Sequence, residues 1–445
     1  MKRILIAIVL LVSIHTAKGQ NVVVLDSTLV HVEVVIDSSI INGAWDIEWG
    51  PDDHLWIGDL EYIMRYNPVS TVLDTVFTKP TDNALGLAIH PNFPDTPYVF
   101  VVFDTADYYS SGPEANLFRY EWNGTNLINE TLLLTYSHNG EHSGGRVIVT
   151  QDNKLLLTTA DYWWNGDSLM GRVLRINLDG SVPSDNPDPN QLEWTSGHRN
   201  PQGLTQTPNG NVYISEHGQS ENNELNLLIA GGHYGWPAYD GNDCFFSDSC
   251  NSSTYSYIPA ISITSAPPSG AEYYDHPSIP EFANSILIGT LWGSMSLDAH
   301  TLNAAGDSVV QYRKYLNVPN YGRIRDIVSA PDGSVYFIGF DRQLPTAIYR
   351  VYNPNYTPTG IYSGEANMKL SVYPNPTTGE LTLVLDNTYD DIIINVRNVS
   401  GKLISTQSYK STKNITFEIK EARGVYIIEV SNQEGNYANL RVLKQ

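Results

Sequence analysis

Short apolar runs alternate with turn-forming residues along most of the chain. β-branched and aromatic residues gather in runs bounded by Gly, Asn, Asp and Pro, and few stretches show helical periodicity. One phrase recurs, in which a turn containing Pro, Asp or Asn precedes an apolar strand. Its six occurrences lie at residues 50–57, 90–100, 151–157, 207–213, 282–288 and 330–336. Repeats spaced about one blade apart predict an all-β fold, a six-bladed β-propeller that binds ligands at one end of its channel.

The pattern changes after Val351. Residues 352–360 are rich in Pro, Asn and Thr, which is typical of a linker. Alternating apolar and polar positions return at 392–396, 414–419 and 424–430, and they predict a small C-terminal β-sandwich. The predicted domains are therefore a propeller at 20–351, a linker at 352–365 and a second β domain at 366–445.

The N-terminus has the form of a secretory signal. Lys2 and Arg3 precede an apolar run at residues 4–14, and small and polar residues follow up to Gly19. The run is too short to cross a bilayer, so we predict a signal peptide at 1–19 rather than a membrane span or a buried first element. In an exported protein, Cys244 and Cys250 are expected to form a disulfide. A thiol metal site would need further ligands nearby.

The net charge limits the classes of molecule that the protein can bind, but it says little about the reaction. The formal net charge of −22 argues against nucleic acid and anionic membranes, because either would repel the surface. The same charge is compatible with simple solubility, so it does not indicate a substrate.

The densest group of polar residues and glycines lies between residues 196 and 237. Arg199 beside Asn200 suits the capture of a planar oxyanion, since a guanidinium presents paired donors. Backbone carbonyls on a Gly turn, with Glu216 and Glu224 close behind, suit calcium, which prefers several oxygen ligands. Taken singly, each residue also has an ordinary structural explanation, such as a salt bridge or a solvated loop.

Four phrases in this region stand out: Gly197-His-Arg-Asn-Pro-Gln-Gly203, Glu216-His-Gly218, Glu224-Leu-Asn226 and Tyr234-Gly-Trp-Pro237. Together they resemble the soluble glucose dehydrogenase and aldose sugar dehydrogenase family, also called glucose/sorbosone dehydrogenases. The resemblance extends over about residues 40–351. It implies oxidation of an aldose to a lactone with pyrroloquinoline quinone and Ca²⁺, the electrons passing to a separate acceptor.

The resemblance also implies roles for individual residues. His142, in the phrase His142-Ser-Gly-Gly-Arg146, matches the family's catalytic base, and a neutral imidazole has suitable basicity to take the anomeric hydroxyl proton. Asp161 would orient that imidazole or bind a sugar hydroxyl, unless it only caps a turn. Arg199 would stabilise charge on the quinone oxygens. The remaining cofactor contacts would be Asn200, Thr264, Arg323 and Arg325, and the calcium ligands would be Gly218, Gln219, Glu224 and Tyr234.

Two departures from the family pattern bear on the substrate. Thr81 or Asp82 stands where the glucose-oxidising members have a Gln beside the substrate. A cofactor-binding Lys of those members falls near Leu291 and Trp292, and Trp292 could instead stack on the cofactor or sugar. The expected substrate is therefore an aldose of unspecified identity.

The C-terminal segment resembles the sorting domain of the type IX secretion system. The matching phrases are Tyr373-Pro-Asn-Pro376, Val399-Ser-Gly-Lys402 and Gly424-Val-Tyr426. The resemblance implies secretion, or display on the cell surface, through the type IX machinery. An adhesive or carbohydrate-binding sandwich is the alternative, although no row of aromatic residues suggests one.

Two further hypotheses concern the whole propeller. It could bind a polysaccharide or a protein without catalysis, since one fold serves many functions. It could also be a lactonase or another hydrolase, which would hold calcium through Asn, Asp and Glu side chains. His142 together with Arg199, Arg323 and Arg325 favours the oxidoreductase, because a binding module needs no base facing a tricarboxylate site.

Overall fold

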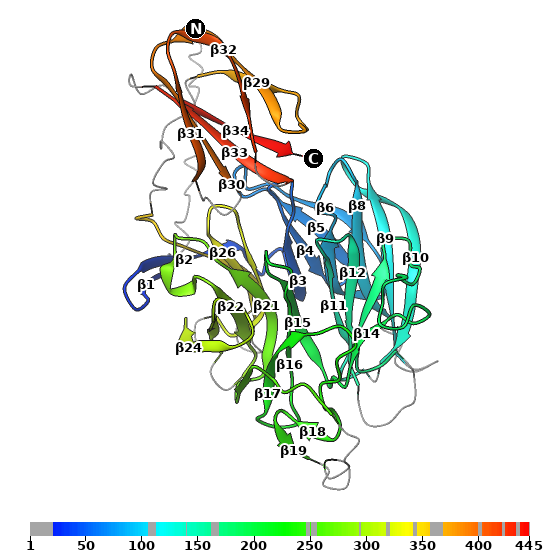
Figure 1. Cartoon of the computed structure of the whole chain (residues 1–445). Coiled ribbons are helices and arrows are strands. Elements are labelled where there is room, and N and C mark those ends of the chain that lie inside the picture. Colours follow the sequence, from blue (N-terminus) through cyan, green and yellow to red (C-terminus); the bar gives the residue numbers. More distant parts are fainter. Residues whose placement is uncertain are drawn as a thin grey trace, which may run out of the picture.

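The chain folds almost entirely into β-strands (Figure 1). The computed structural model describes residues 21–105, 113–138, 140–161, 169–245, 250, 256–292, 295–316, 321–340, 345–356, 368–398, 403–420, 423–432 and 437–444. Helical positions within these residues are one turn of 3₁₀-helix at Pro280–Phe282 and the single residue Cys250. The all-β prediction is confirmed. The predicted signal peptide at 1–19 and most of the predicted linker lie outside the described residues.

Six antiparallel sheets of four or five strands occupy residues 21–352 of the described chain. The first three are β3 (Ala44–Trp49), β4 (Leu55–Asp59), β5 (Tyr62–Tyr66) and β6 (Leu73–Thr78); β7 (Asp82–Ile89), β8 (Tyr98–Thr105), β9 (Glu114–Trp122) and β10 (Leu127–Ser137); and β11 (Gly144–Val149), β12 (Lys154–Thr159), β13 (Arg172–Asn177) and β14 (Glu193–Ser196). The next three are β15 (Pro201–Gln206), β16 (Val212–Glu216), β17 (Asn223–Leu228) and β20 (Ser262–Thr264); β21 (Pro268–Tyr274), β22 (Ser285–Thr290), β23 (Leu297–Leu302) and β24 (Val309–Tyr315); and β25 (Arg323–Ser329), β26 (Val335–Phe340), β27 (Ala347–Tyr352), β2 (Leu29–Ile36) and β1 (Asn21–Val24).

The first strands of these sheets form a closed ring. β3 contacts β7, and the contacts continue through β11, β15, β21 and β25 back to β3. The ring is fastened by β2, which pairs with β27 and so joins the N-terminal strand to the last sheet. Sheets arranged around an axis in this way make a β-propeller, whose closure protects the sheet edges.

Strand β8 shows why the apolar runs fold this way. Val99, Val101 and Phe103 pack on the sheet before it, and Phe100 and Val102 pack on the sheet after it. Successive side chains of a strand point to opposite faces, so a strand between two stacked sheets must be apolar at every position. The recurring turn phrase of the sequence links the first strand to the second in each sheet, as at Gly50–Asp53 and Thr207–Gly210.

The axis of the ring holds a cavity of about 270 Å³ that residues from all six first strands line. Glycines let these strands approach each other near the axis. At Gly86 of β7, for example, a Cβ would lie 2.0 Å from the carbonyl oxygen of Gly145 in β11. Any larger residue would push these two sheets apart.

Two further sheets follow the propeller and share one apolar core. The core joins Leu383 of one sheet to Ile394 and Ile428 of the other. The strands are β28 (Leu370–Tyr373), β29 (Glu380–Tyr389) and β32 (Thr412–Glu418) in the first sheet, and β31 (Leu403–Tyr409), β30 (Ile392–Asn398), β33 (Gly424–Ser431) and β34 (Tyr437–Lys444) in the second. Figure 1 shows these orange to red strands grouped beside one end of the ring.

Two smaller predictions have been tested. Cys244 and Cys250 form the expected disulfide, next to the short hairpin of β18 (Tyr239–Asp240) and β19 (Asp243–Cys244). Among the described residues, no helix has the length and apolar character needed to cross a membrane.

Candidate active site

A cavity of about 570 Å³ lies where the first strands of the sheets begin. The position follows from the fold, because loops from several sheets converge at the ends of a propeller channel. The lining residues that bear on the chemistry are Trp45, Asn83, Asp104, Glu141, His142, Asn200, Gln202, His217, Trp292, Arg323 and Arg325.

One wall of this cavity is cationic. Arg323 and Arg325 are two residues apart on β25, so both side chains project from the same face of the strand. The Arg325 guanidinium lies 3.9 Å from the centre of the Trp45 ring, and that of Arg323 lies 5.0 Å from the Trp292 ring. In the described part of the chain neither arginine makes an ion pair, and Arg323 Nε is buried without a hydrogen-bond partner.

The charge on this wall is therefore uncompensated. Burial, helped by the nearby charges of Arg146 and Arg323, lowers the pKa of Arg325 to about 10. A guanidinium in such surroundings is stabilised most by an anion, and best by a planar carboxylate that takes two parallel hydrogen bonds.

His142 faces the same cavity from the segment that precedes β11. Partial burial, together with the charge of Arg199, lowers the pKa of His142 below its ordinary value, so the ring is neutral at pH 7. Its Nδ1 lies 3.4 Å from the backbone carbonyl of Asp161. If Nδ1 carries the proton and donates it to that carbonyl, Nε2 is the basic nitrogen.

Asp161 approaches the imidazole through its main chain. Its carboxylate Oδ2 accepts a hydrogen bond from Trp236 Nε1 at 3.2 Å, and its N–H donates to the Arg199 carbonyl at 2.7 Å. The carboxylate is thus engaged with Trp236, while the carbonyl is the group near His142. Asp161 was predicted either to orient the His142 ring or to bind a sugar hydroxyl. The contact between its carbonyl and His142 Nδ1 fits the first of these roles.

Arg199 and Asn200 enter the site at the start of β15. Glu216 accepts the backbone N–H of Arg199 at 2.9 Å, and the Arg199 head group lies 3.4 Å from the His217 carbonyl. The Asn200 side chain accepts a hydrogen bond from Gln202 at 2.9 Å and lines the cavity. Arg199 is not among the lining residues but contacts the backbone of His217, which is.

His217 also lines the cavity, although no role was predicted for it. Burial lowers its pKa to about 4, so the ring is neutral, and Nε2 lies 2.6 Å from the Pro268 carbonyl. An N–H at Nε2 leaves Nδ1 as an acceptor toward Asn200, 3.4 Å away. The one feature of the sequence that pointed to His217 was its position in the Glu216-His-Gly218 phrase. That phrase does not show which groups the imidazole ring contacts.

The predicted calcium ligands form two groups. Gly218 and Gln219 lie in the turn after β16, and their carbonyl oxygens accept no hydrogen bond from the described residues. A Cβ at Gly218 would lie 2.3 Å from the Asn222 carbonyl oxygen, so only glycine fits this turn. The Gln219 side chain contacts Arg199 at 3.3 Å, which puts the free carbonyls beside the candidate cofactor residues. Carbonyls of this kind fit a hard cation.

The second group lies deeper in the same sheet. Glu224 stands directly opposite Glu216 across β16 and β17, and Tyr234 stacks on His198. Burial raises the pKa of Glu216 to about 7 and also raises that of Glu224. A shared proton or a cation would relieve the repulsion between the two carboxylates. Over the described residues, no cluster of three or more His, Cys, Asp or Glu side chains suitable for a metal occurs.

Thr264 lies away from the cavity. Its hydroxyl donates to the Ala266 carbonyl at 3.2 Å, and its own carbonyl accepts a hydrogen bond from Asn223. Neither Thr81 nor Asp82 lines the cavity, whereas the next residue, Asn83, does. The structure therefore brings together His142, Asn200, Trp292, Arg323 and Arg325 on one cavity, and sets the other predicted residues around it.

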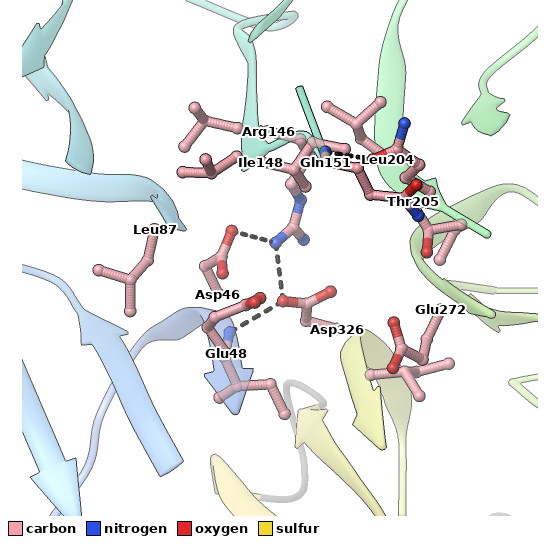
Figure 2. Close-up of a pocket in the computed structure, with 16 residues that line it drawn as sticks. Asp46, Glu48, Leu87, Arg146, Ile148, Gln151, Leu204, Thr205, Glu272 and Asp326 are labelled. Carbon is pink, nitrogen blue, oxygen red and sulfur yellow. Dashed lines mark hydrogen bonds and ion pairs between the residues drawn. The ribbon is translucent and has the colours of Figure 1, made fainter. Parts of the chain in front are cut away.

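Arg146 lies in the axial cavity and contacts the backbone of the cationic wall. Figure 2 shows its guanidinium between Asp46 and Asp326 in the axial cavity, where Nη1 lies 2.7 and 2.9 Å from the two carboxylates. Its Nη2 donates to the backbone carbonyls of Trp45 and Arg325. One buried side chain thus holds the backbone of both members of the Trp45–Arg325 pair.

Comparisons with known proteins identify relatives of both parts of the chain. The profile of the "Glucose / Sorbosone dehydrogenase" family matches residues 41–344, and that of the "Secretion system C-terminal sorting domain" matches residues 371–444. The quinoprotein glucose dehydrogenase B of Acinetobacter calcoaceticus is 33% identical over 247 residues, which are 46% of this chain and 52% of that protein. The aldose sugar dehydrogenase YliI of Escherichia coli is 26% identical over 45% of this chain and 57% of its own length. The chain thus spans about half the length of these two relatives.

A solved structure shares the fold over the whole propeller. The PQQ-bound aldose sugar dehydrogenase of Streptomyces coelicolor superposes with a TM-score of 0.61 at 22% identity, covering 73% of this chain and 98% of that one. The resemblance noted from the sequence is confirmed for both parts of the chain. The chain belongs to the glucose/sorbosone dehydrogenase family and ends in a secretion-system C-terminal sorting domain.

Proposed function

We propose that the protein is an exported quinoprotein that oxidises the anomeric carbon of an aldose to a lactone, with pyrroloquinoline quinone and Ca²⁺ as cofactors. The proposal includes a signal peptide at 1–19, a six-bladed propeller at 20–351, a linker at 352–365 and a sandwich-like sorting domain at 366–445 that is read by the type IX secretion machinery. Support for the blade count comes from the six sheets of the ring, and support for the sandwich from two sheets on one core.

A single observation carries the proposal: a neutral imidazole and an uncompensated cationic wall face one cavity. Arg323 and Arg325 have no acidic partners among the described residues, and His142 lines the same space. Pyrroloquinoline quinone carries three carboxylates, so it would supply the missing negative charge. A module that only binds a neutral polymer would gain nothing from burying two unpaired guanidiniums, since unpaired buried charge is destabilising.

The proposal assigns a role in cofactor binding or proton transfer to each of the following residues. Arg323 and Arg325 would hold carboxylates of the cofactor, and Arg199 would stabilise negative charge on its quinone oxygens. When bound, the quinone would serve as the oxidant, accepting the anomeric hydrogen together with its two electrons as a hydride. His142 takes the proton of the anomeric hydroxyl at Nε2, and the Asp161 carbonyl holds the ring through Nδ1. A separate acceptor then receives the electrons.

Calcium would bind at the Gly218–Gln219 turn, through the two carbonyls that accept no hydrogen bond from described residues. Bound there it would act as a Lewis acid on the cofactor. Glu224 and the Tyr234 carbonyl are the proposed ligands of a second ion, which would also relieve the Glu216–Glu224 repulsion.

Reconstitution tests the proposal. Protein lacking residues 1–19 is titrated with pyrroloquinoline quinone in the presence of calcium, and binding is followed by quenching of tryptophan fluorescence, with dye reduction measured on a panel of aldoses. We expect binding at micromolar concentration and reduction of the dye by at least one aldose. Arg325→Ala should weaken quinone binding about tenfold or more, because a hydrogen-bonded charged partner is lost. Absence of quinone binding to the wild-type protein would overturn the proposal.

A further inference from the structure

We infer that Asp104 and Asn83 form a subsite for two neighbouring hydroxyl groups of the sugar, and that this subsite selects uncharged sugars over sugar acids. The inference rests on the proposed function, because it concerns how the oxidised sugar is held. It starts from two polar side chains on the cavity wall that the family resemblance leaves without a role.

Asp104 is held so that one oxygen is anchored and the other is not. The residue is 7% exposed at the end of β8, and its Oδ1 lies 2.9 Å from His138 Nε2. No hydrogen bond or ion pair from a described residue reaches Oδ2. Since Asp104 lines the cavity, this oxygen can accept a hydrogen bond from a molecule inside it.

His138 fixes this orientation. Its side chain is 0% exposed, and its Nδ1 accepts the backbone N–H of Gly140 at 3.1 Å. An imidazole that accepts at Nδ1 carries its proton at Nε2, so the ring donates to Asp104. The buried ring therefore holds one oxygen of Asp104 in place and leaves the other oxygen toward the cavity.

Asn83 completes the pair. It stands directly opposite Asp104 across β7 and β8, and cross-strand partners project from the same face of a sheet. Its amide has no hydrogen-bond partner in the described residues and also lines the cavity. A carboxylate acceptor beside an amide donor matches two adjacent hydroxyls of a sugar ring, each of which both donates and accepts.

The inferred selectivity for uncharged sugars follows from the position of the pair. Arg323 and Arg325 lie on β25, whereas Asp104 and Asn83 lie on β8 and β7, so the cavity has a cationic and an anionic side. With the arginines occupied by cofactor carboxylates, the sugar would meet the anionic side. A uronic acid or sugar phosphate would then bring a second negative charge near a largely buried carboxylate, which is unfavourable.

The test measures sugar binding without oxidation. The 1,5-anhydro analogues of glucose, galactose and mannose have no anomeric hydroxyl, and their binding to the cofactor-loaded protein is measured by calorimetry. We expect Asp104→Ala and Asn83→Ala each to weaken binding about tenfold or more, with no change in quinone affinity. Asn83→Ala leaves the buried His138–Asp104 pair intact, so it reports on the subsite even if Asp104→Ala folds poorly. Glu114→Gln, on the neighbouring strand and away from the cavity, is the matched control and should bind like the wild type.

A second readout addresses charge. Asp104→Asn should raise the ratio of kcat/KM for a uronic acid to that for its neutral aldose about tenfold, whereas Glu114→Gln should leave the ratio unchanged. Wild-type affinity for the analogues in both alanine variants, or no analogue binding to the wild type, would overturn the subsite. Intact analogue binding without oxidation of any aldose would instead overturn the proposed dehydrogenase activity and leave the subsite standing.

Discussion

At the scale of single residues, His142 is set to act as a base near neutral pH. Burial and the Arg199 charge lower its pKa, so the neutral form prevails at pH 7. We predict that His142→Ala lowers kcat about 10²–10⁴-fold, the usual contribution of a general base. Quinone binding should be unchanged, because the cationic wall is on β25. Stopped-flow dye reduction beside a fluorescence titration separates the two effects.

The lowered pKa of His142 also determines where kcat/KM falls on the acidic side of its pH profile. Protonation of His142 abolishes the base, so log kcat/KM should fall with decreasing pH around a midpoint below 6.5, the ordinary histidine value. His90→Gln is the control: it removes a buried imidazole that does not line the cavity, and it should leave this midpoint in place. A midpoint above 6.5, or wild-type turnover in His142→Ala, would assign the base to another residue.

Residues in contiguous phrases could be predicted from the sequence. His142, Asn200, Arg323 and Arg325 each belong to such a phrase, and the structure brings them to one cavity. Trp45 and Asp104 could not be predicted, because they reach the cavity only when separate sheets close into a ring. No local periodicity encodes such an approach between sheets.

At the scale of elements, the positions of strands could be predicted from the apolar runs in the sequence, whereas the pairing of one strand with another could not. The apolar run of β8 was visible in the sequence, but nothing there indicated that β2 would pair with β27, more than three hundred positions away. Pairing of this kind depends on the geometry of the whole ring. The N-terminal strand is thus the element on which closure depends.

We predict that loosening β2 destabilises the whole propeller. Val32 is 1% exposed and packs in the core with Phe337 and Val351, so Val32→Ala should lower stability by about 1–3 kcal/mol through lost burial and the cavity left behind. Val22, on β1, is 56% exposed, and Val22→Ala should change nothing measurable. Differential scanning calorimetry compares the two variants. Equal melting temperatures would mean that β2 does not contribute to closure.

At the scale of the whole molecule, the candidate active site and the C-terminal domain lie at opposite ends of the ring. The active-site cavity opens where the first strands begin, whereas Arg441 of the C-terminal domain contacts the Pro51 carbonyl in the turn that follows β3. The sorting domain therefore touches the ring at the end away from the cavity. Its cleavage or its attachment to an anchor would leave the site open to sugars.

The channel between these ends makes stability depend on pH. Glu272 lines the axial cavity near Asp326 and Glu48, and burial raises its pKa to about 7 (Figure 2). The unfolded chain loses this proton near pH 4.5, so between about pH 5 and pH 7 the folded state holds more protons than the unfolded state. The free energy of unfolding must then fall as pH rises through this window.

Glu272→Gln should remove part of that dependence. An amide oxygen can still accept the hydrogen bonds that Ser329 donates to Glu272, but it binds no proton between pH 5 and 8. From pH 5 to pH 8 we therefore expect the melting temperature of the wild type to fall further than that of the variant, by a few degrees, about 2–4 °C for each kcal/mol of linked stability. Glu221→Gln, an exposed change on the same ring, should follow the wild type. If all three proteins lost stability in parallel, Glu272 would be ionised in the folded state, and a proton held in the channel would belong to another of its carboxyls with a raised pKa, Glu48, Asp46 or Asp326.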